Sequence, residues 1–194
     1  MKKALLLLCM AVLIPLHTLS DACVGRILNI GIVHSTNENL MAELVSVLIS
    51  ERTGTTVNVQ FFDDRGAIYD ALKQDKIGII IENTDHAMEM MEIQSTDDPK
   101  TAYDLSKKAF RERLNLIWLK PFGPLPEDKG KGQVYYSAVI TEDVLINFPA
   151  LPRVINKLKN ISEDKRFNKI LVSARSGKKV KRVARDFLKK KKLI

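Results

Sequence analysis

Between residues 28 and 81, short apolar runs alternate with longer segments of helical periodicity. The apolar runs at 28–33, 57–61 and 77–81 are rich in β-branched residues, which favours strands. The run at 77–81 has no polar side chain, as expected of a strand that is covered on both faces. A strand–helix–strand–helix–strand order is typical of a parallel sheet with helices on its faces, so we predict an α/β fold.

Both connecting segments carry the signals of helix ends. Ser35 and Glu38 have the spacing of a capping box, in which the hydroxyl and the carboxylate bond free backbone N–H groups. Gly54 is placed to end this first helix, because glycine readily adopts the left-handed conformation of a helix stop. Asp63-Asp64 is placed to cap the second helix.

The rest of the chain continues the same alternation. We predict a helix from Asp98 to Arg113, a strand at 114–119, a loop at 121–132 and a last strand at 134–140. Two helices are expected to finish the chain. Their apolar faces are Leu151, Val154, Ile155 and Leu158, and Val180, Val183, Ala184, Phe187 and Leu188.

Residues 1–22 follow the order of a bacterial secretory signal. A basic start precedes a short apolar run at 4–16, and Ser20 and Ala22 are the small residues before a cut after residue 22. The apolar run is shorter than the roughly 20 residues that span a bilayer. We therefore predict a signal peptide at 1–22 and a single α/β domain at 23–194, exported to the periplasm.

Cleavage at that point leaves Cys23 as the first residue of the mature chain. Lipid attachment through Cys23 is one alternative, although Leu19 and Asp21 match the motif that precedes a lipidated cysteine poorly. A free thiol and a disulfide between two molecules are the others.

Charge is divided unevenly along the chain. Residues 150–194 carry 16 basic and 3 acidic side chains, a net charge of +13, whereas residues 23–149 carry 13 basic and 19 acidic ones, a net charge of −6. We expect no nucleic-acid partner, because the chain is exported and the basic region has few aromatic residues for base stacking. A solvated helix face is the simpler interpretation, and a surface that faces an anionic membrane is the alternative.

Any small-molecule site is expected at one edge of the predicted sheet. In a parallel sheet, ligands bind beyond the carboxyl ends of the strands, where helix N-termini point. The loops at these ends are 34–37, 63–65 and 82–85.

The sequence lacks the motifs of the common catalytic and cofactor sites. It has no Gly-x-Ser-x-Gly, no glycine-rich phosphate-binding motif, and no His-x-x-x-His or closely spaced cysteine pair for a metal. We therefore expect no catalytic residue, no metal and no cofactor, and predict that the protein is not an enzyme. Phe61-Phe62 and the methionines at 88, 90 and 91 are expected to serve packing.

Five short motifs, in the same order, resemble the substrate-binding proteins of glycine betaine/choline/carnitine ABC importers. They are residues 30–44, Ala71-Leu72-Lys73 before Ile77 to Asp85, Trp118 to Gly123, Phe148-Pro149, and Val183 to Leu188. The similarity runs from about residue 27 to residue 194. It implies a type II periplasmic-binding-protein-like fold, which in that family has two lobes that close on a quaternary ammonium solute.

Two departures from the family pattern bear on function. Only residues 122–133 separate the points between which the family chain builds its second lobe, so the resemblance implies a single lobe. The family's binding positions are also changed, here to 34–37, 63–65 and Asn83. Aromatic faces for cation–π attraction are therefore missing from the matching positions.

The resemblance implies a non-catalytic, solute-binding component of an ABC importer for osmoprotectants of the glycine betaine and choline type, with an ABC permease as partner. The residues expected to line its site are Thr36, Asn37, Asp64, Glu82, Asn83 and Thr84. The alternative is an envelope protein-interaction or sensory module that kept the lobe and lost the solute. Its open surface would then contact another envelope protein or a second copy of the chain, as a homodimer.

Overall fold

A computed structural model describes residues 27–126 and 133–194. The predicted signal peptide at 1–22 and Cys23 lie outside the described residues, and so does half of the segment, residues 127–132, at which the second lobe is expected to be missing. No helix within the described ranges has the length and apolar character needed to cross a bilayer.

The sheet is mixed, and its strands lie in the order β2-β1-β3-β6-β4, with β5 paired to β6. β1 pairs in parallel with β2 and with β3, whereas β6 runs antiparallel to β3, β4 and β5. The strands are β1 Leu28–Val33, β2 Val57–Phe62, β3 Ile79–Asn83, β4 Ile117–Trp118, β5 Pro124–Pro126 and β6 Gln133–Ile140.

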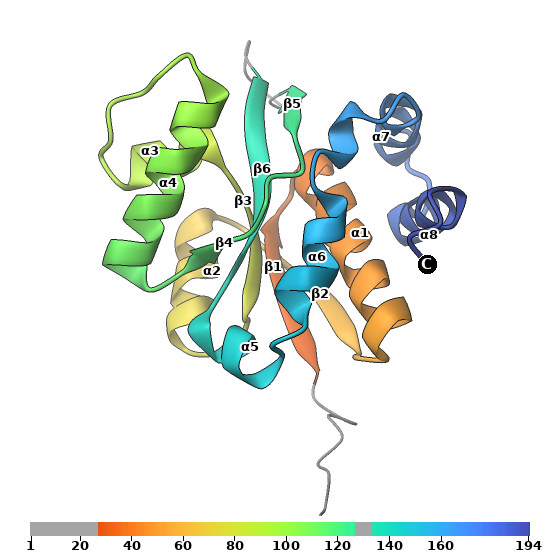
Figure 1. The fold of residues 1–194 in the computed structure, drawn as a ribbon, viewed down its shortest axis with the longest axis horizontal. Helices are drawn as coiled ribbons and strands as arrows, with labels where there is room; N and C mark the ends of the chain where they lie inside the picture. The colour runs from red at the N-terminus through yellow and green to blue at the C-terminus, as the bar shows by residue number, and fades with distance from the viewer. Residues whose placement is uncertain (1–26, 127–132) are drawn as a thin grey trace, which may run out of the picture.

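Helices cover both faces of this sheet, which gives three layers (Figure 1). One face carries α2 Arg65–Lys73, α3 Thr84–Met90 and α4 Pro99–Leu114. The other carries α1 Thr36–Thr53 and α6 Leu151–Ile155, with α7 Phe167–Arg175 and α8 Val180–Lys190 outside α1. α5 Glu142–Asn147 lies at the end of β6, and two 3-10 turns, Asn156–Leu158 and Ile161–Glu163, lead from α6 toward α7.

Two apolar cores follow from the alternation of side chains along the strands. On β3, Ile79 and Ile81 belong to the core under α1, whereas Ile80 belongs to the core under α2 and α4. The predicted strand with both faces covered is therefore confirmed. α1 is buried on two sides, because the sheet lies against one side and α8 against the other.

The α/β fold and most elements up to residue 113 are confirmed, and the differences lie in the short elements. The predicted strand at 114–119 shrinks to two residues, because α4 extends to Leu114 and ends on the left-handed Asn115 (φ 55°). β5 lies in the segment that we predicted as a loop. α3, α5 and α7 were not predicted, since runs of six to nine residues show too little periodicity.

Gly123 provides a test of how the segment before β5 packs. Its φ is +99°, and a β-carbon there would meet the Ser162 hydroxyl and lie 3.3 Å from the Asn160 Cα. We expect Gly123→Ala to lower the free energy of unfolding in urea by about 2–4 kcal/mol, from backbone strain and overpacking together.

Gly177 is the matched control, because it has a φ of +77° with nothing within 4 Å of an added β-carbon. Gly177→Ala should lower the free energy of unfolding by only about 1–2 kcal/mol, the cost of holding an alanine in the left-handed conformation. Equal losses in the two variants would contradict the packing of Gly123 against Ser162.

Candidate functional site

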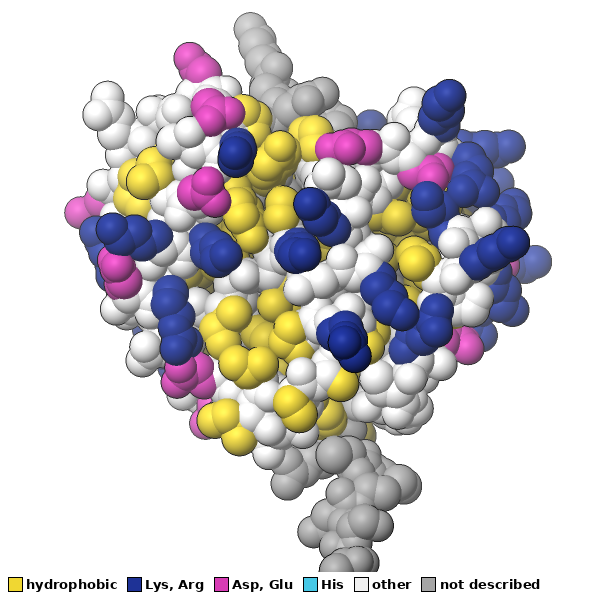
Figure 2. Space-filling model, viewed as in Figure 1, with side chains coloured by type: hydrophobic (Ala, Val, Ile, Leu, Met, Phe, Trp, Pro, Cys, Tyr) yellow, Lys and Arg dark blue, Asp and Glu magenta, His cyan; other side chains and the backbone are white. Residues whose placement is uncertain are grey.

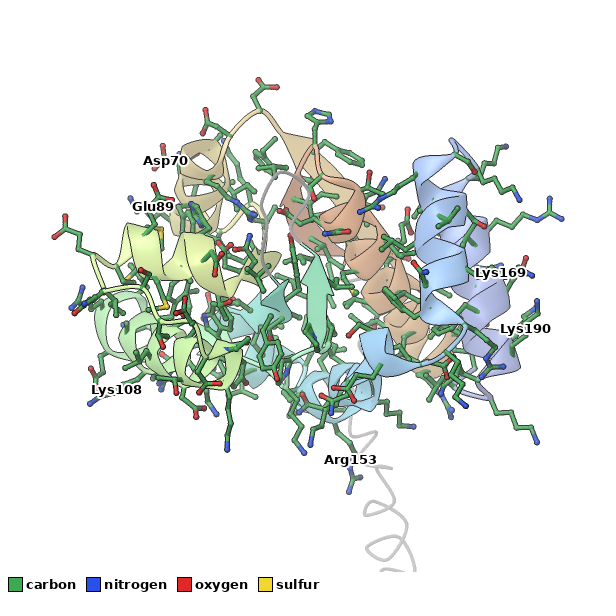
Figure 3. All side chains as sticks on the ribbon, turned by 90° about the horizontal axis from the view of Figure 1, so that it is seen from above. Asp70, Glu89, Lys108, Arg153, Lys169 and Lys190 are labelled. Carbon is green, nitrogen blue, oxygen red and sulfur yellow. The ribbon has the colours of Figure 1, made fainter. Side chains whose placement is uncertain are left out.

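The carboxyl ends of β1, β2 and β3 meet at one edge of the sheet, and Figure 3 looks down onto this edge. The parallel register pairs Val33 with Phe62, so the loops that follow β1 and β2 start side by side. β6 begins at the same edge, because its antiparallel register sets Tyr136 opposite Asn83. Four chain segments therefore converge where the sequence predicts a ligand site.

A partly buried cluster of ionisable side chains, which we call the Arg65 network, lies under this edge. It consists of Glu38 on α1, Arg65 and Tyr69 on α2, Glu82 on β3 and His86 on α3. The Arg65 guanidinium contacts the Glu38 carboxylate, donates to the Ile81 carbonyl at 3.1 Å and lies 3.4 Å from Glu82 Oε1. One cation thus bridges two carboxylates that are almost fully buried.

Glu82 has a partner for each of its oxygens. Tyr69 donates its hydroxyl to Oε2 at 2.6 Å, and the His86 ring nitrogen Nδ1 lies 3.2 Å from the same oxygen. The backbone N–H of Asn83 donates to Oε1 at 2.8 Å. A buried carboxylate satisfied in this way is stable in the interior, so Glu82 is a structural anchor of the edge.

The pKa values of the two carboxyl groups in the network shift in opposite directions. Burial acts to raise the pKa of Glu82, but the Arg65 charge and the hydrogen bonds from His86 and Tyr69 lower the pKa below its ordinary value. Burial raises the pKa of Glu38 to about 7, in spite of the Arg65 charge. For the Tyr69 hydroxyl, burial and the neighbouring Glu82 charge raise the pKa well above its usual range.

The predicted site residues gather at this edge, but local structure uses most of their polar groups. The Asn83 side chain caps α3 by accepting from the His86 N–H at 3.0 Å, and the Thr84 hydroxyl accepts from the Tyr135 N–H at 3.3 Å. Asp64 is exposed and caps α2 through the Ala67 N–H at 2.8 Å. Asn37 is fully buried, and Thr36 is half-buried at the start of α1.

Sequence reasoning missed the partners that hold these residues. Glu38 was assigned only to a capping box, but its carboxylate accepts from the Val33 N–H at 3.1 Å and contacts Arg65. The Ser35 hydroxyl does accept from the Glu38 N–H, at 3.3 Å, as predicted. A signal for Tyr69 existed, because it lies four residues after Arg65 on the same face of α2. Helical spacing gave no such signal for His86, because Glu82 belongs to β3 and His86 to α3.

An exposed aromatic pair also lies at this edge. The Phe61 ring is 46% exposed and stacks on the His34 ring, with centroids 5.2 Å apart and planes at 18°. The expectation that Phe61 serves packing is therefore wrong, whereas Phe62 does pack against the core under α2. Strand alternation puts Phe61 on the same face of β2 as Val57 and Val59, which pack in the core under α1. Its exposure goes with its place near the end of β2, which is an edge strand.

Three grooves lie elsewhere on the described part of the chain. The first, of about 730 Å³, runs between α7 and α8. The others, of about 220 and 180 Å³, lie near Thr141, toward the opposite edge of the sheet. None of the three is lined by the six predicted ligand residues. Within the described ranges, no group of three or more His, Cys, Asp or Glu side chains is placed to hold a metal ion.

Comparison with known families identifies the chain. Residues 27–128 match the family described as the substrate-binding domain of the ABC-type glycine betaine transport system. The chain belongs to this family. The matched range includes all three strand-end loops and the whole Arg65 network.

Solved structures show the same fold. A glycine betaine/carnitine/choline ABC transporter structure aligns with a TM-score of 0.73 at 12% identity, covering 87% of this chain and 98% of that chain. Apo YehZ from Escherichia coli aligns with a TM-score of 0.72 at 13% identity, covering 87% and 99%. No curated protein sequence matches the chain.

The pKa of Glu38 predicts a dependence of stability on pH. A carboxyl group whose pKa rises from 4.5 to about 7 on folding stabilises the fold fully below pH 4.5, and this contribution is lost as the pH rises through 7. We expect the free energy of unfolding to fall by up to about 3 kcal/mol between pH 5 and pH 8.

Glu38→Gln is the variant that checks this assignment, because an amide oxygen can still accept from Val33 and Arg65 but does not titrate. Urea unfolding of this variant at several pH values should give a nearly flat profile between pH 5 and 8. If the free energy of unfolding of the variant falls with pH as steeply as that of the unchanged chain, a group other than Glu38 causes the pH dependence.

Proposed function

We propose that the protein is the solute-binding component of an ABC importer for quaternary ammonium osmoprotectants of the glycine betaine and choline type. The observation that carries the proposal is the position of the family match, which covers the edge where β1, β2 and β3 end. The absence of a catalytic or cofactor motif from the sequence agrees with a binding role. An ABC permease is the partner that such a role requires.

The proposed solute lies on the exposed rim of this edge, above the buried carboxylates. Glu82 and Glu38 are almost fully buried and both contact Arg65, so neither carboxylate faces a solute on the surface. On the rim, the stacked rings of Phe61 and His34 present an aromatic face, and exposed Asp63 lies directly after β2. A quaternary ammonium group is attracted to aromatic faces and to carboxylates.

We also propose that the protein consists of a single lobe and that the second lobe of the family is missing between about residues 122 and 133. One open edge buries less of a solute than the closed pocket that small-molecule sites usually provide. We therefore infer weak binding, with dissociation constants in the millimolar range, unless another protein closes the site.

Isothermal titration calorimetry with glycine betaine, choline and carnitine tests direct binding. We expect heat of binding for at least one of the three solutes at millimolar concentration. Phe61→Ala should weaken that binding about two- to fivefold, the magnitude of a cation–π contact at an exposed position. Ile146→Ala is the control, because Ile146 is 72% exposed on α5, away from the β1–β3 edge.

The alternative function is an envelope protein-interaction or sensory module that kept the lobe and lost the solute. The observation in its favour is Arg65, whose guanidinium fills the acidic environment that would otherwise attract a cation from solution. An absence of heat with all three solutes would contradict solute capture and favour this alternative. A second copy of the chain, or another envelope protein, would then cover the open edge.

The proposed function also requires export. We propose that residues 1–22 are removed as a signal peptide and that the mature chain, beginning at Cys23, is periplasmic. Mass spectrometry of the protein from the periplasmic fraction should give the mass of residues 23–194. A larger mass that returns to this value in Cys23→Ser would assign a lipid anchor to Cys23, and the intact chain in the cytoplasm would contradict export.

A further inference from the structure

The largest of the three grooves lies between α7 and α8 and is lined mainly by cationic side chains. Its volume is about 730 Å³. Asp186 is its one acidic lining residue, and Ile170, Val183 and Phe187 contribute apolar surface. The cationic lining residues are Arg166, Lys169, Lys178, Lys179, Arg182 and Lys190.

Most of this charge is not neutralised by the protein. Arg166 lies 3.2 Å from Asp164, which also binds Lys191 at 2.6 Å. The other five cationic lining residues form no ion pair with any residue in the described ranges. The groove therefore presents a local excess of positive charge, which attracts anions at physiological ionic strength.

Positive charge is densest on one side of the molecule. Figure 2 shows Lys and Arg side chains gathered over the α7–α8 side. In Figure 3, Lys169 and Lys190 lie on that side, whereas the labelled residues on the opposite side are of both signs, Asp70 and Glu89 with Lys108. The positive surface is therefore directional, and it can orient the protein on a negatively charged partner.

The chemistry of the groove fits anionic phospholipid better than other polyanions. Phospholipids combine a phosphate with apolar chains, and here cations surround an apolar floor, while Val172 on the adjacent α7 turn is 57% exposed. Nucleic acid requires exposed aromatic faces for stacking, but the one aromatic residue of the lining, Phe187, is 2% exposed.

We propose that the α7–α8 groove docks the protein onto the surface of a bilayer that contains anionic phospholipid. Several lysines near a membrane act additively through the negative surface potential. α7 and α8 lie outside α1, to the side of the carboxyl edge of the sheet (Figure 1). A protein docked through this groove keeps that edge uncovered, so docking and access to the edge are compatible.

Flotation of the full chain with lipid vesicles tests the proposal. We expect binding to vesicles of phosphatidylcholine with 30% phosphatidylglycerol, much weaker binding to pure phosphatidylcholine, and release as salt is raised to 0.5 M. The pure phosphatidylcholine vesicles correct for any binding through the apolar N-terminal run. The variant Lys169→Glu/Lys179→Glu/Lys190→Glu should lose affinity for the anionic vesicles by at least about fiftyfold.

The matched control is Lys76→Glu/Lys107→Glu/Lys108→Glu, which changes the net charge equally at three exposed lysines outside the groove. The control variant should lose less than about fivefold in affinity for the anionic vesicles, since charges far from the docked groove are screened. Equal losses in the two variants, or no preference for anionic vesicles, would overturn the proposal. Stronger binding to single-stranded DNA or polyglutamate than to anionic vesicles would also overturn it and assign the groove to another polyanion. Circular dichroism checks that both variants fold.

Discussion

The bridge from Arg65 to two buried carboxylates fixes the edge of the sheet on which function depends. Glu38 lies at the start of α1, Glu82 at the end of β3, and Arg65 at the start of α2. A buried carboxylate without a partner costs several kcal/mol, so these three ends are stable only together. The Val33 N–H, which donates to Glu38, adds the end of β1. The positions of the loops therefore follow from one shared cation.

The same bridge limits what the edge can bind. A carboxylate that already contacts a guanidinium, a hydroxyl and a backbone N–H has few lone pairs left for a ligand, and this is the state of Glu82. Glu82, which the sequence predicts as a ligand residue, is therefore poorly available to a solute. In the proposed function, a cation is therefore recognised on the exposed rim, where the exposed rings of Phe61 and His34 stack.

Local patterns in the sequence predicted the elements that are long or fully buried. β1, α1, β2 and α2 were predicted within one or two residues, because their periodicity, caps and stops are all local signals. The direction of β6 was not predictable, since strand direction is set by distant pairing. The bond between Arg65 and Glu38 joins residues 27 positions apart, so neither motif alone indicates it. Asn83 was interpreted as a ligand, although an Asn before a short polar run is also a helix cap.

Packing explains why α8 exists but not why its outer face is basic. Ala184, Phe187 and Leu188 are buried in the core that α1 shares with α8, and Arg185 reaches Glu51 at 3.2 Å. The outward positions of an amphipathic helix need only be polar, and a mixture of both signs satisfies this requirement with less self-repulsion. The 16 basic and 3 acidic side chains at 150–194 therefore carry a repulsive cost that folding does not require. A negatively charged partner surface offsets that cost, and this makes the charge bias itself an argument for docking.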